Sequence, residues 1–95
     1  MVELKPGQLV RSLAGRDKGK HYLVLEELND KYVLLVDGRS RPASRPKRKN
    51  KIHLQHYDRG VDDRAIFQEG RVTDSQVVRF ISELLNKTGT PDEEV

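Results

Sequence analysis

The chain has 95 residues, which is enough for one small domain built around a single core. It has no cysteine, which excludes disulfides and thiolate zinc sites, and no apolar run near the length of about 20 residues that a membrane helix needs. The net charge is +3, 35% of the residues are charged, and the N-terminus shows no secretory signal, so we expect a polar, cytoplasmic protein.

The first part of the chain is typical of short β-strands joined by tight turns. Aliphatic and alternating stretches predict strands over residues 8–13, 21–28 and 31–36. The glycine-containing segment 14–20 is a turn between the first two strands, and Asn29-Asp30 suits a hairpin connection between the second and third. Several short strands with tight turns predict a small antiparallel barrel.

The middle of the chain is interrupted by prolines. Pro42 and Pro46 remove two backbone donors and predict a loop of about ten residues, followed by a fourth short strand around 51–54. Residues 55–57 are candidates to close the sheet, and Asp58-Arg59-Gly60 is predicted to break it. A short helical turn carrying Ile66 and Phe67 is expected within 61–69.

A C-terminal amphipathic helix is predicted over 73–88. Thr73 and Gln76 have the spacing of a capping box, and Asp74 lies in the first turn, where the helix dipole favours an acid. Gly89 and Pro91 are predicted to end the helix and leave an acidic tail over 89–95. The apolar stripe, which we expect to pack against the core, consists of Val77, Phe80, Ile81, Leu84 and Leu85.

Charge is strongly segregated along the chain. Residues 39–51 contain seven basic and no acidic side chains, whereas residues 1–38 are neutral and residues 52–95 carry a net charge of −4. The natural partner of such a basic segment is a polyanion, because each neutralised phosphate releases condensed counterions. The alternative is a solvated basic loop without a specific partner.

The sequence contains no recognisable catalytic or cofactor motif. Gly15 and Gly19-Lys20 lack the spacing of a nucleotide phosphate loop, and no third ligand accompanies His53 and His56 to make a metal site. Glu26 and Glu27 are adjacent in a predicted strand and would point to opposite faces. We therefore expect a protein that is not an enzyme and has no metal and no cofactor.

Residues 7–57 taken together resemble a KOW-domain segment. The resemblance is carried by GQLVRSL, AGRDKGK, HYLVLEEL, NDKYVLLVDG and the closing IHL. More narrowly, the segment is similar to the large-subunit ribosomal protein family L-fourteen-e of archaea and eukaryotes. The likeness ends at Tyr57, and the net-acidic residues 58–95 replace that family's long basic extension, so the chain resembles the short free-standing KOW proteins of bacteria.

The resemblance implies an SH3-like barrel that binds structured RNA, typically ribosomal RNA. We therefore expect a mainly β fold: an SH3-like antiparallel barrel over 1–57 with its basic loop at 39–51, a connecting segment over 58–72, the helix over 73–88 and the tail. The expected function is non-catalytic RNA binding in association with the ribosome, as a monomer. A ribosomal or translation-factor protein is a possible further partner, and no membrane is expected.

Two basic segments are predicted to contact RNA phosphates. Glycines shape their turns, and surface aromatics are too few to form a platform for stacking successive bases, although Tyr32 or Tyr57 could stack one flipped base. Two other functions remain open: a protein-interaction adaptor that uses the barrel and the helix, and a DNA-binding accessory of transcription. The turn-shaping glycines are Gly15, Gly19 and Gly38. The predicted RNA-binding residues are Arg16, Lys18, Lys20, Arg39, Arg41, Arg45, Lys47, Arg48, Lys49 and Lys51.

Overall fold

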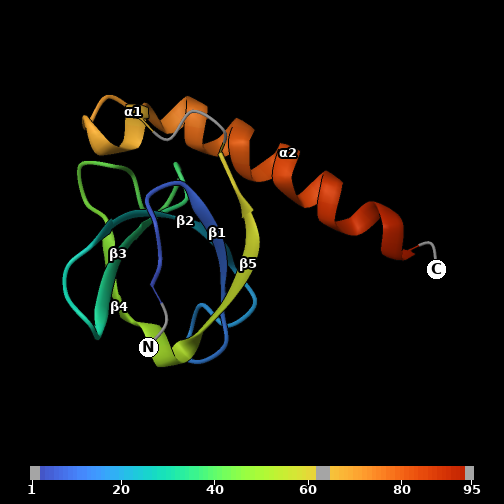
Figure 1. Cartoon of the computed structure of the whole chain (residues 1–95), viewed down its shortest axis with the longest axis horizontal. Helices are drawn as coiled ribbons and strands as arrows, with labels where there is room; N and C mark the ends of the chain where they lie inside the picture. Colours follow the sequence, from blue (N-terminus) through green and yellow to red (C-terminus); the bar gives the residue numbers. More distant parts are fainter. Residues whose placement is uncertain (1–2, 62–64, 94–95) are drawn as a thin grey trace.

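The computed structural model describes residues 3–61 and 65–93, without the side chains of Gln68 and residues 87–93. The fold is mainly β, as expected: one five-stranded antiparallel sheet with strand order β4-β3-β2-β1-β5, followed by a C-terminal helix. In Figure 1 the sheet curls, and both helices lie on one side of it. The elements are β1 Gln8–Ser12, β2 His21–Glu27, β3 Tyr32–Val36, β4 Lys47–Asn50, a 3-10 helix Lys51–His53, β5 Leu54–Gly60, α1 Ala65–Gln68 and α2 Asp74–Glu93.

The sheet buries apolar side chains on both of its faces. Alternation along β1 places Leu9 in one buried cluster and Val10 in the other. The inner cluster also contains Leu4, Tyr22, Val24, Val33, Leu35 and Leu54. The outer cluster, which the helices cover, also contains Leu23, Val36, Val61, Phe67, Val72, Val77 and Leu84. This double burial explains why β2 and β3 read as nearly continuous aliphatic runs.

The fourth strand lies earlier than predicted. It is β4, Lys47–Asn50, inside the segment expected to be a loop, whereas the predicted strand 51–54 is a 3-10 helix and the first residue of β5. The strand begins directly after Pro46, where a missing backbone donor breaks no ladder bond, and its charged side chains are tolerated because β4 is an edge of the sheet. The basic loop is therefore shorter than 39–51.

The last strand is longer than predicted. Residues 55–57 join the sheet as part of an edge strand beside β1. Asp58-Arg59-Gly60 does not break it, because β5 continues along β1 until Gly60 pairs with Gln8. A register shift between Gln8 and Val10 accommodates this end of the ladder, and the Gln8 side-chain amide donates to the Tyr57 carbonyl at 2.9 Å.

The helices follow their predicted starts but not the predicted end. The capping box is confirmed: the Thr73 N–H donates to Gln76 Oε1 at 2.9 Å, and the Gln76 N–H donates to Thr73 Oγ1 at 3.2 Å. α1 carries the buried Phe67, as expected for the short helical turn.

The end at residue 88 is wrong, since α2 continues through Gly89 and Pro91 to Glu93. A glycine costs a helix about 1 kcal/mol and a proline about 3 kcal/mol, so each opposes the helix without being an absolute stop. The residues predicted as tail are therefore helical as far as Glu93. Asp62, Asp63 and the last two residues of that tail lie outside the described residues.

Candidate nucleic-acid interface

Asp17 organises the turn between β1 and β2. Its carboxylate accepts hydrogen bonds from Ser12 Oγ, Tyr22 OH and Lys49 Nζ, each at 2.8 Å. Lys47 Nζ lies 3.8 Å from the same carboxylate. Burial opposes the charge, but the hydrogen bonds from Lys49, Ser12 and Tyr22 outweigh it and hold the pKa of Asp17 below its usual 3.8. For Tyr22, burial and the bond to Asp17 raise the pKa above its usual 10.0.

Asp37 organises the basic loop between β3 and β4 in the same way. Its Oδ1 accepts the backbone N–H groups of Arg39 and Arg41, both at 2.8 Å, and its Oδ2 accepts the Ser40 hydroxyl at 3.0 Å. Burial raises the pKa of Asp37, but these bonds and Lys20 outweigh burial and lower it to about 2. Asp37 thus ties the backbone of Arg39 and Arg41 and the Ser40 side chain to the end of β3.

Helix α2 holds the far side of this loop. Asp74 Oδ1 accepts the Ala43 N–H at 2.8 Å. Gly38 lies so close to the helix that a Cβ at this position would be 2.5 Å from the Asp74 carbonyl oxygen. The first turn of α2 therefore has a second role besides covering the core: it fixes the loop that carries Arg39, Arg41 and Arg45.

Ion pairs join the two basic segments into one surface. Lys20, at the end of the turn, lies 3.0 Å from Asp37 Oδ2 and donates to Ser40 Oγ at 2.9 Å. Lys49, on β4, donates to the Ala14 carbonyl at 2.9 Å and pairs with Asp17. Segments 14–20 and 39–51 are far apart in the sequence, but side-chain contacts hold them together.

The predicted cations divide into an exposed and an internally paired group. Lys47 and Lys49 pair with Asp17, and Lys51 pairs with Glu27, which also accepts the Leu4 N–H at 3.1 Å. The bonds from Lys51 and Leu4 lower the pKa of Glu27. Lys20 is paired with Asp37, yet its side chain remains 45% exposed, and Arg41 is half-buried. The exposed cations without an acidic partner among the described contacts are Arg16, Lys18, Arg39, Arg45 and Arg48.

The two tyrosines singled out for stacking already have partners. The Arg48 guanidinium carbon lies 4.5 Å from the centroid of the Tyr32 ring. Tyr57 is stacked with His21 at 6.0 Å between centroids. Burial, together with the nearby Arg11, lowers the pKa of His21 below 6.5. Of these two tyrosines, Tyr32 is the one packed against an exposed arginine, Arg48.

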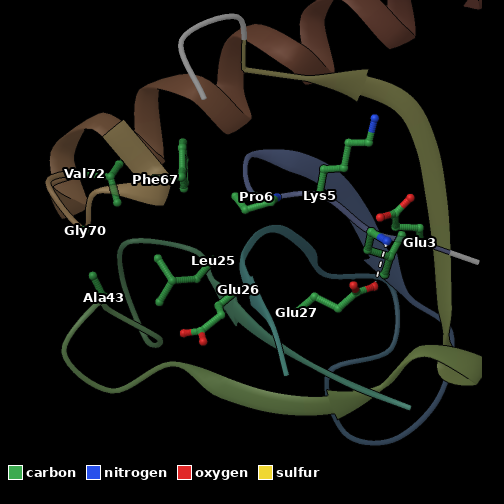
Figure 2. A pocket seen from close by; sticks show the side chains of 11 residues that line it. Glu3, Lys5, Pro6, Leu25, Glu26, Glu27, Ala43, Phe67, Gly70 and Val72 are labelled. Atoms are coloured by element: carbon green, nitrogen blue, oxygen red, sulfur yellow. Dashed lines mark hydrogen bonds between the residues drawn. The ribbon is translucent and has the colours of Figure 1, made fainter. Parts of the chain in front are cut away.

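A groove of about 850 Å³ opens elsewhere, between the N-terminal segment, β2 and α1 (Figure 2). Phe67, Leu25 and Val72 give it apolar walls, and Glu3, Glu26, Glu27 and Lys5 are its charged lining residues. Glu26 and Glu27, expected to point to opposite faces of a strand, both line it; a register shift between Val24 and Glu26 lies next to them. Three carboxylates against one amine make this groove unsuited to a polyanion.

Sequence reasoning missed the acids that position the basic segments. Neither Asp17 nor Asp37 was predicted to hold these segments in place. An Asp side chain in a turn commonly accepts the backbone N–H two residues later, and Asp37, which precedes Gly38, is such a residue. The conformations of the three predicted turn glycines fit their role, since Gly15, Gly19 and Gly38 have φ of 89°, 92° and 79°.

Comparison of the sequence with family models and with curated proteins finds no relative: no protein-family model matches the chain, and no curated protein matches it either. In the described part of the chain, no helix is long and apolar enough to cross a membrane, and no three His, Asp or Glu side chains are grouped to hold a metal ion.

Proposed function

We propose that this protein is a non-catalytic RNA-binding protein, associated with the ribosome, that recognises folded RNA through phosphate contacts. The observation that carries the proposal is the joining of two basic segments through Lys20 and Lys49. The carboxylates of Asp17 and Asp37 hold both segments, so the backbone that carries the exposed cations is positioned before RNA arrives. A surface that is already ordered loses less conformational entropy on binding than a mobile basic loop would.

The proposal includes the finer identity of the fold, an SH3-like barrel of the KOW class. The short antiparallel strands and the curled sheet support it, because β4 reaches the turn 14–20 through Lys49. The Lys49 side chain makes the contact between β4 and the turn 14–20.

Charge reversal on the exposed cations tests RNA binding directly. The test variant is Arg16→Glu with Arg45→Glu, one residue from each basic segment. The matched control is Lys5→Glu with Arg59→Glu, which makes the same charge change on exposed residues at the other end of β1. The probe is a fluorescein-labelled RNA hairpin with an unpaired loop, titrated at several salt concentrations.

The expected size follows from counterion release. Each phosphate contact on a single strand contributes about −0.7 to the slope of log affinity against log salt, so five contacts give about −3.5. Loss of two contacts makes the slope shallower by about 1.4, to about −2.1, and weakens binding about 25-fold at 0.1 M salt. The control should bind like the wild type. Equal binding by all three proteins would contradict the proposal, and tighter binding of duplex DNA than of the hairpin would favour the transcription accessory.

The adaptor function was expected to use the barrel and the apolar stripe of the C-terminal helix, and the stripe is not free for a partner. The apolar stripe of α2 packs on the sheet, with Val77 and Leu84 buried and Phe80, Ile81 and Leu85 against the same cluster. The acidic and apolar groove of Figure 2 still favours a protein partner as a second candidate function.

A further inference from the structure

The face of β3 and β4 that points away from the inner core carries an aromatic ring next to an exposed arginine. Antiparallel pairing sets Tyr32 opposite Asn50 and Leu34 opposite Arg48. Val33 and Leu35 point into the inner core, so Tyr32 and Leu34 share the other face with Arg48. Among the described residues, the helix-covered cluster reaches Val36 on β3 but includes neither Tyr32 nor Leu34, both of which are half-buried.

Arg48 is paired with a ring rather than with a carboxylate. Its guanidinium carbon lies 4.5 Å from the centroid of Tyr32, and the residue is exposed. A guanidinium is planar and weakly hydrated, and it stacks on aromatic rings with one face while the other face remains open to a second flat group. The neighbouring Lys47 and Lys49 reach Asp17 instead, so Arg48 is the cation that β4 presents on this face.

The position of Arg48 relates this face to the phosphate-binding cations. Arg45 lies in the loop that leads into β4, and the turn carrying Arg16 and Lys18 is held against β4 by the bond from Lys49 to the Ala14 carbonyl. An RNA strand whose phosphates contacted Arg45 would therefore run past the end of β4, and an unpaired base could reach Arg48 and Tyr32 on the face opposite Lys49.

We propose that Arg48 and Tyr32 form a stacking site for one unpaired nucleobase, a proposal that rests on the RNA-binding function above. A nucleobase fits this surface better than an apolar peptide side chain does, because the exposed group is a planar cation. Proteins recognise unpaired RNA bases by stacking them on aromatic rings and Arg guanidinium planes. The site would give the protein a preference for loops and bulges over continuous duplex.

The decisive variant is Arg48→Lys, which keeps the charge but removes the planar group. Arg59→Lys makes the same chemical change on an exposed residue of β5 and is the matched control. The probes are an RNA hairpin with 2-aminopurine in its unpaired loop and a blunt RNA duplex without unpaired bases. Thermal unfolding of each variant confirms that it is folded.

We expect Arg48→Lys to weaken hairpin binding by about 5- to 150-fold, the usual worth of one stacked base. The salt slope and duplex binding should stay unchanged, and the change in 2-aminopurine fluorescence that accompanies wild-type binding should be lost. If Arg48→Lys binds the hairpin like the wild type while Arg16→Glu with Arg45→Glu is weakened, the stacking site is refuted and the phosphate surface stands. If the wild type binds neither RNA, both proposals fail.

Discussion

Replacement of Gly38 by alanine tests the contact between the basic loop and helix α2. The glycine has φ of +79°, a conformation that costs other residues about 1–2 kcal/mol. A Cβ there would lie 2.5 Å from the Asp74 carbonyl oxygen and 2.8 Å from Val78 Cγ2. Forcing a methyl group into packed surroundings costs a further 1–3 kcal/mol or so.

The two costs can be separated because Gly19 provides a matched control. It has φ of +92°, but a Cβ built on it meets no atom within 4 Å. Gly19→Ala should therefore show the backbone cost alone, about 1–2 kcal/mol, and Gly38→Ala a total of about 2–5 kcal/mol. At about 4–8 °C per kcal/mol, the midpoint of Gly38→Ala should lie at least about 4 °C below that of Gly19→Ala.

Urea titrations and thermal unfolding of both variants measure the difference. A separate RNA-binding titration of each variant without urea shows whether the loop has moved, since Gly38→Ala should also weaken binding. Equal loss of stability in the two variants would refute the close approach of Gly38 to α2, and with it the idea that the helix fixes the basic loop.

Three further outcomes follow from the contacts. Because the pKa of Asp37 is lowered from 3.8 to about 2, its contribution of about 2 kcal/mol should be complete above about pH 5 and largely lost as pH falls to about 2. Urea titrations against pH should show this slope, and Asp37→Asn should make it shallower, leaving the part that Asp17 and Glu27 contribute. Lys49→Met leaves Asp17 without its closest charge partner and should cost about 3 kcal/mol, whereas Lys18→Met, on an exposed turn residue, should change unfolding by less than about 0.5 kcal/mol. Phe80→Ala should cost about 2 kcal/mol in the same titrations, less than the 3–5 kcal/mol or so of a fully buried ring; an unchanged stability would return the stripe to the adaptor function.

The parts of the fold that could be predicted are those specified by local patterns. The strands up to Val36 alternate or are aliphatic because both faces of the sheet are buried, and the capping box at Thr73 is a local arrangement of four residues. The last strand and the end of α2 were misjudged because glycine and proline were treated as breaks. Pairing with β1 carries the strand to Gly60, and Gly89 and Pro91 oppose the helix without ending it.

The arrangement of the site depends on partners distant in the sequence. Nothing in the segment around β4 alternates between apolar and polar, so its strand could not be read from the pattern. Its lysines are fixed by Asp17, which lies 32 residues before Lys49. The sequence therefore predicted that the region is basic, but it could not separate cations that face solvent from cations that hold the molecule together.

Ultraviolet crosslinking in the cells that make the protein, with sequencing of the bound RNA and mass spectrometry of the crosslinked peptides, tests the central claim most directly. The account predicts one discrete site on a folded RNA, with crosslinks in residues 14–20 and 39–48 and at Tyr32. Recovery of no RNA above background, or crosslinks confined to the groove around Glu26 and to α2, would contradict it.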